Sequence, residues 1–208
     1  MGYKQNNIFQ ESDLQFQFSD TDWRVKKYDT HRFFKTLSGA GLKGVDFLGI
    51  FQDKQVVLWE VKNYHTNQAN KSQNYLIVEN TVVFIENIIG KVTDTLTAIR
   101  VIQQYLNRQW WYRFYSAYSS YIPTFLIRQK DWFFWHQIQK ISKEKGAVTF
   151  VLWLEIEASL EVKVWKKILT TIQQELSKQL KKEDISLVIA SINQPYFGAS
   201  LQVSQQKK

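Results

Sequence analysis

The sequence predicts an α/β fold in which a mixed central sheet is flanked by helices. Three apolar runs of strand length lie at residues 44–51, 55–63 and 148–155. Helical spacing of apolar residues occupies residues 85–107 and about 159–182. Strands that alternate with helices in this way are typical of a sheet covered by helices.

In the first part of the chain, residues 1–18 are polar and predict a loose lead-in with at most one short helix. A helix is expected over residues 23–37, with a capping residue among 19–22 and Gly39 at its end. After the two strands, residues 63–74 are rich in Asn and Gln and predict a loop.

In the second part, residues 76–84 fit a strand and a helix equally well, and residues 202–208 are expected to fray. The expected elements are a helix over 85–107, an aromatic and basic stretch over 108–121, a short strand over 124–128, a helix over 131–145, a strand over 148–155, a helix from about 159 to 182 and a last strand over 186–192. We interpret residues 1–208 as a single domain, with a core of about 20–107 plus 146–192 and a helical, aromatic insertion over about 108–145.

The composition narrows the classes of function. The formal net charge is +8 and the sequence pI is about 9.5, which suits a phosphate backbone or an anionic lipid surface as partner. A soluble basic protein without a polyanionic partner is the other interpretation of this charge. The chain has no Cys, which excludes disulfides, thiolate–zinc sites and a Cys nucleophile. No apolar run approaches the roughly 20 residues of a membrane helix, and residues 1–13 are polar, so we expect a cytoplasmic protein without membrane contact.

The two strands at 44–51 and 55–63 form a hairpin with charges at the end far from the turn. A three-residue turn centred on Asp53 would place Asp46 opposite Glu60, with Cβ atoms roughly 4.5–5.5 Å apart. Lys62 shares the face of Glu60 because side chains alternate along a strand. Asp46, Glu60 and the main-chain carbonyl of Val61 would supply oxygen ligands for Mg²⁺. A structural ion triad at the rim of the sheet is the other interpretation.

Near the turn, both faces of this hairpin are apolar. Leu48, Ile50, Val56 and Leu58 lie on the face of Glu60, and Phe47, Phe51, Val57, Trp59 and Val61 lie on the other. Such a pattern predicts an interior hairpin that is covered on both sides.

The order Val45-Asp46, then Glu60-Val61-Lys62, resembles the motif of the PD-(D/E)xK nuclease superfamily, with Val45 in the place of the Pro. The resemblance implies a restriction-endonuclease-like core and a metal-dependent endodeoxyribonuclease of a restriction, repair or mobile-element system. It implies Asp46, Glu60 and Lys62 as catalytic residues, Mg²⁺ as cofactor with Mn²⁺ as a substitute, and DNA as partner. A homodimer would let such a small nuclease cut both strands. A nuclease-like module that only binds DNA or a protein is the alternative function.

Many members of this superfamily add a helix Glu to the metal site, but no Glu lies between residues 23 and 46 here. Asp29 is the nearest acidic residue, with His31 close to it in the sequence. Asn63 and His65 follow the strand of the motif. These four residues are accessory candidates.

Basic residues for contacts with DNA are expected in two places. Lys71 lies in the polar loop, and Arg100, Arg108 and Arg113 are interleaved with aromatic residues such as Trp110. Interleaved cations and rings can neutralise phosphates and stack on bases. A hydrophobic core or a dimer interface would have the same composition.

Overall fold

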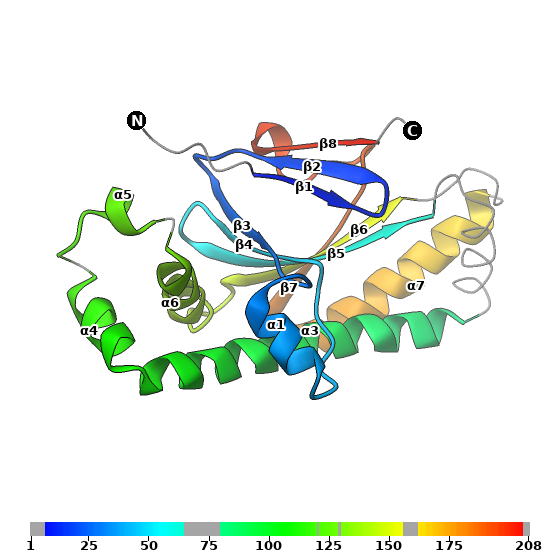
Figure 1. Cartoon of the computed structure of the whole chain (residues 1–208). Helices are drawn as coiled ribbons and strands as arrows, with labels where there is room; N and C mark the ends of the chain where they lie inside the picture. The colour runs from blue at the N-terminus through cyan, green and yellow to red at the C-terminus, as the bar shows by residue number, and fades with distance from the viewer. Residues whose placement is uncertain (1–6, 65–79, 120, 129, 156–161, 206–208) are drawn as a thin grey trace.

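The computed structural model describes residues 7–64, 80–119, 121–128, 130–155 and 162–205, and it has the mixed α/β architecture that the sequence predicts (Figure 1). A five-stranded sheet has the order β3-β4-β5-β6-β7, with antiparallel pairing from β3 to β5 and parallel pairing from β5 to β7. Its strands are β3 (Trp23–Lys27), β4 (Phe47–Phe51), β5 (Gln55–Asn63), β6 (Val148–Glu155) and β7 (Ile185–Ala190).

A second, three-stranded antiparallel sheet has the order β1-β2-β8. Its strands are β1 (Ile8–Glu11), β2 (Leu14–Phe18) and β8 (Leu201–Gln205). The helices are α1 (Arg32–Ser38), α3 (Thr81–Arg108), α4 (Trp110–Tyr118), α5 (Thr124–Ile127), α6 (Asp131–Ile141) and α7 (Val162–Leu180). Figure 1 shows the small sheet on one side of the large sheet and the long helices α3 and α7 on the other.

The β4–β5 hairpin has the register that the sequence predicts. Phe51 pairs with Gln55, and Leu48 pairs with Leu58. Within the turn, Gln52 and Asp53 have positive φ angles of 48° and 55°. A turn in this conformation matches the twist of the flanking strands and fixes their register.

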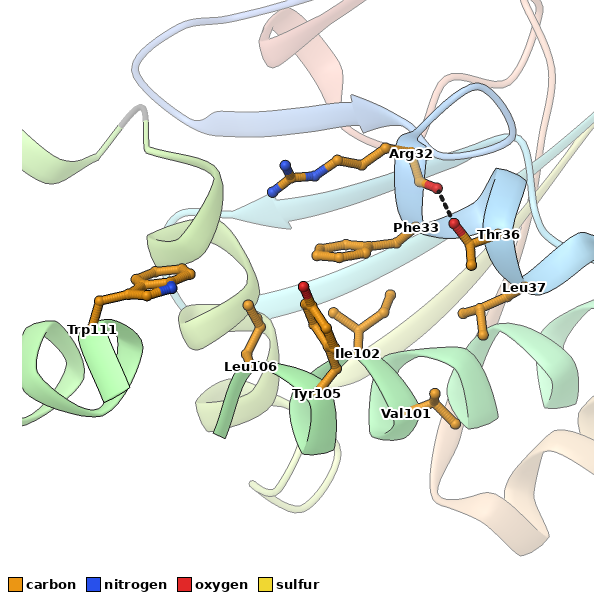
Figure 2. A pocket seen from close by; sticks show the side chains of 9 residues that line it. All are labelled: Arg32, Phe33, Thr36, Leu37, Val101, Ile102, Tyr105, Leu106 and Trp111. Carbon is orange, nitrogen blue, oxygen red and sulfur yellow. Dashed lines mark hydrogen bonds between the residues drawn. The ribbon is translucent and has the colours of Figure 1, made fainter. Parts of the chain in front are cut away.

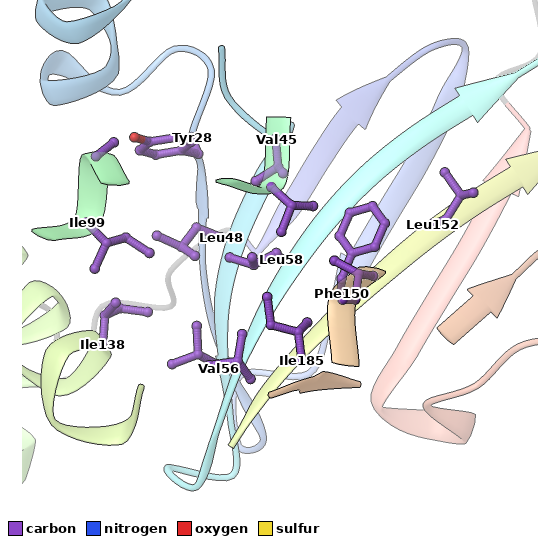
Figure 3. Close-up of a cluster of buried hydrophobic side chains, with 14 of the residues drawn as sticks. Tyr28, Val45, Leu48, Val56, Leu58, Ile99, Ile138, Phe150, Leu152 and Ile185 are labelled. Atoms are coloured by element: carbon purple, nitrogen blue, oxygen red, sulfur yellow. The ribbon is translucent and has the colours of Figure 1, made fainter. Parts of the chain in front are cut away.

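Each face of the large sheet belongs to its own hydrophobic core. Leu48, Ile50, Val56 and Leu58 belong to the core that the helices cover. Figure 3 shows Leu48, Val56 and Leu58 on the same side of the sheet as Ile99 and Ile138. Phe47, Val57, Trp59 and Val61 pack on the other side against the small sheet, with Phe16 and Phe18. The prediction of a hairpin covered on both faces is therefore confirmed, and β6 is buried along its whole length for the same reason.

The helix expected over residues 23–37 is wrong in its first half. Residues Trp23–Lys27 form β3, which pairs antiparallel with β4, and the helix α1 begins only at Arg32. Trp23 explains the difference, because its side chain packs into the core between the two sheets. The centroid of its ring lies 4.6 Å from that of Phe51 and 5.3 Å from that of Phe18. Tertiary packing here overrides local helical spacing.

The two ends of the described chain are also more ordered than expected. Residues 8–18 form the β1–β2 hairpin rather than a loose lead-in, and residues 201–205 form β8 rather than a frayed tail. The alternating sequences LQFQF of β2 and LQVSQ of β8 pair with each other along their full length. Each strand is stabilised by a partner almost two hundred residues away, so neither is recognisable as part of the core on its own.

The remaining elements follow the predictions closely, with two corrections. The expected short strand at 124–128 is the helical turn α5, and the last strand of the large sheet is followed by β8. The ambiguous residues 76–84 resolve into the start of α3 from Thr81, whereas 76–79 lie outside the described residues. In the described part of the chain, no helix combines the length and apolarity needed to cross a membrane.

Candidate active site

Asp46 is held in place from three directions just before β4. Its N–H donates to the carbonyl of Trp59 at 2.9 Å, and its carbonyl accepts from the N–H of Tyr28 at 2.8 Å. Its Oδ2 accepts a 2.7 Å hydrogen bond from the N–H of Val61. The last regular pair of the ladder is Phe47 with Trp59, so Asp46 does not form the direct pair with Glu60 that the register predicts. Its carboxylate turns instead toward the edge of β5.

Glu60 lies on β5 with its side chain fully buried. Its Oε1 accepts from Lys62 Nζ at 2.7 Å and from Lys91 Nζ at 2.6 Å. Its Oε2 is buried and has no hydrogen-bond partner among the described residues. One carboxylate therefore holds two ammonium groups side by side.

Lys62 keeps its proton in this arrangement. Burial alone would lower the pKa of Lys62, but the carboxylates of Glu60 and Asp46 outweigh it and raise this pKa above its ordinary value. A lysine with a raised pKa acts as a fixed positive charge and not as a base. This arrangement suits Lys62 for the stabilisation of negative charge rather than for the abstraction of a proton.

Lys91 is a site residue that the sequence analysis missed. It lies on α3, where Thr95, one turn further, accepts a 3.1 Å hydrogen bond from the N–H of Val45. This buried contact docks α3 against the residue before Asp46 and brings Lys91 over β5. The available signal was a cation within the apolar stripe of the helix, between Ile88 and Thr95.

The second half of the site comes from the N-terminal strands. Carboxylate oxygens of Glu11, Asp29 and Asp46 all lie within 4.8 Å of one another. Glu11 is the last residue of β1 and precedes a tight turn. Asp29 follows β3 by two residues, and it lies near Asp46 because Lys27 at the end of β3 pairs with Phe47, the neighbour of Asp46. The accessory candidate Asp29 is therefore close to Asp46, although from the end of a strand and not from a helix. Nothing in the local sequence distinguishes Glu11.

The electrostatics of this carboxylate group are unfavourable without a cation. Burial, and then the charge of Glu60, raise the pKa of Asp46 from 3.8 to about 7. Burial also raises the pKa of Asp29, whose Oδ1 is buried and without a hydrogen-bond partner in the described part of the chain. Lys27 Nζ, at 2.8 Å from Glu11, offsets one of these charges. Carboxylates in such an environment ionise readily only when a cation joins them.

The other accessory candidates have contacts of their own. His31 caps α1 by accepting from the N–H of Phe33, and its Nε2 lies 3.2 Å from Asp131. Asn63 donates from Nδ2 to the carbonyl of Ser12 at 2.7 Å. His65 and Lys71 lie outside the described residues.

Val61, predicted to contribute its carbonyl to a metal, lies beside Asp46. The hydrogen bonds from Val56 to Ala147 and from Tyr64 to Glu155 show that the even residues of β5 point their peptide groups toward β6. The N–H and C=O of Val61 therefore point to the opposite side, toward Asp46, because peptide groups alternate along a strand.

The predicted DNA-contacting arginines lie on the surface. Arg100 and Arg108 on α3 and Arg113 on α4 are exposed. The aromatic residues around them divide between two environments: Tyr112 is buried, whereas Trp110 is 79% exposed. The interpretation as a hydrophobic core is therefore correct for only part of this stretch.

Comparison of the chain with protein-family models, with curated proteins and with solved structures finds no match.

Proposed function

We propose that the protein is a metal-dependent nuclease that hydrolyses phosphodiester bonds, and that its substrate is DNA, cut internally. The observation that carries the proposal is the position of Asp46 between a pair of carboxylates and a pair of lysines. On one side lie the carboxylates of Glu11 and Asp29. On the other side Glu60 forms ion pairs with Lys62 and Lys91. A cation held by carboxylates, next to fixed ammonium groups, would place positive charge on two sides of a bound phosphate. This arrangement suits a reaction at phosphorus.

The donor set fits a hard divalent cation such as Mg²⁺ or Mn²⁺. Asp46, Asp29 and Glu11 offer carboxylate oxygens, and the carbonyl of Val61 points to the same side as Asp46. Mg²⁺ prefers oxygen ligands and retains several waters, so a partial shell of protein ligands suffices. A cation would supply a partner for the buried Oδ1 of Asp29, which has none among the described residues. Glu60, expected from the sequence as a ligand, is better placed to hold Lys62 and Lys91.

The roles of the side chains follow from their charges. When bound, the metal would act as a Lewis acid toward the phosphoryl group and lower the pKa of water. The ammonium groups of Lys62 and Lys91 would stabilise the negative charge that develops on the phosphoryl oxygens as water attacks phosphorus. Glu60 fixes both ammonium groups through one oxygen and so limits their mobility. The leaving oxygen departs from the opposite side of phosphorus.

The order of the strands is consistent with the proposal. An antiparallel hairpin carrying Asp46 and Glu60 continues into a parallel strand and a helix, as expected for a restriction-endonuclease-like core. The net charge of +8 favours a polyanionic substrate.

The test is cleavage of supercoiled plasmid and of end-labelled duplex oligonucleotides with Mg²⁺, with Mn²⁺ and with EDTA. We expect metal-dependent cutting by the wild type and a loss of at least about 100-fold in Asp46→Asn and Lys62→Met. Glu144→Gln and Lys178→Met change the same charges at exposed positions and should cut like the wild type. Cutting retained in Asp46→Asn would contradict the assignment of the site.

One observation favours the alternative of a nuclease-like module that only binds. Glu60, the motif carboxylate, is already bonded to two lysines and is not part of the carboxylate trio. Such a closed ion network is what a site without catalysis would have. Duplex binding with no cutting in either metal would support this second function.

A further inference from the structure

A hollow of about 640 Å³ begins beside the carboxylate group. Lys27, His31 and Arg32 are among the residues that line it, and Lys27 also forms the ion pair with Glu11. Asp131 in its wall is neutralised by Lys26 at 2.9 Å and by Arg32 at 3.0 Å. The hollow is therefore basic overall, and Lys27 in its wall contacts Glu11 of the proposed active site.

A second hollow, of about 440 Å³, lies between α1 and the C-terminal half of α3 (Figure 2). Arg32 lines both hollows, so the two lie next to each other. Figure 2 shows the rings of Phe33 and Tyr105 facing this space, with Trp111 of α4 at its far end. Tyr105 is 53% exposed, so its ring is accessible from the solvent.

Beyond Trp111, the outer surface of α4 carries unusually many exposed rings. Of the nine residues in this helix, Tyr112 is the buried one. The exposed rings on α4 and directly after it are Trp110, Phe114, Tyr115, Tyr118 and Tyr121. Scattered exposed apolar residues are ordinary, but a continuous aromatic surface indicates a binding site.

The charges of the sequence stretch that contains these rings indicate which partner the surface fits. From Thr95 to Lys130 the sequence contains no Asp or Glu but five cations. These are Arg100, Arg108, Arg113, Arg128 and Lys130. A second copy would bring the same cations against each other and be repelled. A polyanion with flat, apolar groups complements both the rings and the charges.

We propose that the two hollows and the exposed face of α4 form one track for a single-stranded segment of nucleic acid. Phosphates would lie against Lys27, Arg32 and Arg113, and bases would stack on the rings of Tyr105 and its neighbours. Single strands are the fitting form because a duplex hides the faces of its bases within its own stack. The inference rests on the proposed nuclease function, since it makes this strand part of the substrate. The substrate would then be a branched or frayed DNA and not a continuous duplex.

The test is fluorescence anisotropy with labelled oligothymidylate of about 16 nucleotides and with a blunt duplex of equal length, in EDTA and low salt. We expect the single strand to bind more tightly than the duplex. Tyr105→Ala and Phe114→Ala should each weaken single-strand binding roughly 5- to 100-fold, as expected for loss of one stacking ring. Tyr105→Phe keeps the ring and should bind like the wild type. Tyr196→Ala removes an equally exposed ring away from the track and is the matched control.

The outcomes separate this inference from the proposed catalysis. If Tyr105→Ala and Phe114→Ala bind and cut like Tyr196→Ala while Asp46→Asn does not cut, the track is wrong and the nuclease is right. If they lose single-strand affinity although the wild type never cuts, the track is right and the catalysis is wrong. If sedimentation shows a dimer that the ring variants dissociate, the surface is a self-association interface and the inference is overturned.

Discussion

Asp46 is the residue at which the proposed function and the stability of the fold oppose each other. Its side chain is 9% exposed, and burial followed by the charge of Glu60 raises its pKa from 3.8 to about 7. The two pKa values differ by about 3 pH units, which corresponds to a free-energy difference of about 4 kcal/mol at 1.36 kcal/mol per pH unit. Ionised Asp46 in the metal-free protein should therefore lower the free energy of unfolding by up to about 4 kcal/mol.

The direction of the pH dependence follows from proton binding. Between about pH 4 and pH 7 the folded protein retains a proton on Asp46 that the unfolded chain releases. Stability should therefore fall as the pH rises through this window and change little more above it. Asp46→Asn removes the charge, and its amide oxygen can still accept the hydrogen bond from Val61. Relative to wild type, the variant should gain stability as the pH rises from 4 to 8, by up to about 4 kcal/mol.

The assay is urea unfolding followed by Trp fluorescence at several pH values from 5 to 8, in EDTA and again in Mg²⁺. In EDTA, the difference in unfolding free energy between Asp46→Asn and wild type should grow with pH. Mg²⁺ should stabilise the wild type more at pH 8 than at pH 5, and should have little effect on the variant. Glu144→Gln, at an exposed position, should show neither effect. A difference that does not vary with pH would refute the reasoning, because Asp46 would then be ionised and fully compensated in the metal-free fold.

Three further perturbations test the surroundings of the site. Lys91→Met removes one of the two ammonium groups on buried Glu60 and should cost about 1.5–3 kcal/mol of unfolding free energy, measured by urea unfolding at pH 7. Thr95→Val leaves the buried N–H of Val45 without its acceptor and should cost about 1–3 kcal/mol in the same experiment, together with lower nuclease activity. Asp131→Asn should lower the thermal midpoint at pH 7, because contacts with His31 and Lys26 hold the pKa of Asp131 well below 3.8 in the folded protein. The difference from the wild type should shrink progressively as the pH falls below about 4.

The elements that the sequence predicts well are those whose stability is local or whose pattern is unambiguous. β5 and β6 are continuous apolar runs, as expected for strands with both faces covered. The register of β4 with β5 follows from the length of one turn. Asp46 departs from the simple register because its N–H bonds to the carbonyl of Trp59 and its carboxylate to the N–H of Val61. That local shift depends on side-chain hydrogen bonding, which a count of residues does not contain.

What the sequence analysis missed depends on contacts between distant segments. β2 and β8 have clear alternation, LQFQF and LQVSQ, but two of the five residues in β2 and three of the five in β8 are polar. Only their pairing, and the packing of Phe16 against Phe47 at 5.4 Å, makes them part of the core. Glu11 reaches the site through this small sheet, and Lys91 reaches it through the docking of α3. A search for motifs within the hairpin cannot identify either residue, because both lie outside it in the sequence.

The site is therefore built from two halves that fold by different means. The hairpin supplies Glu60 and Lys62 through a short turn, whereas Glu11 and Asp29 arrive through β1 and β3. Asp46 belongs to both halves, because its backbone bonds join Tyr28 on one side and Trp59 on the other. A cation bound by Glu11, Asp29 and Asp46 would link the small sheet to the large one, and would stabilise the arrangement of the two sheets as well as the charge of the site. Metal affinity should accordingly be sensitive to changes in the packing between the sheets, far from any ligand.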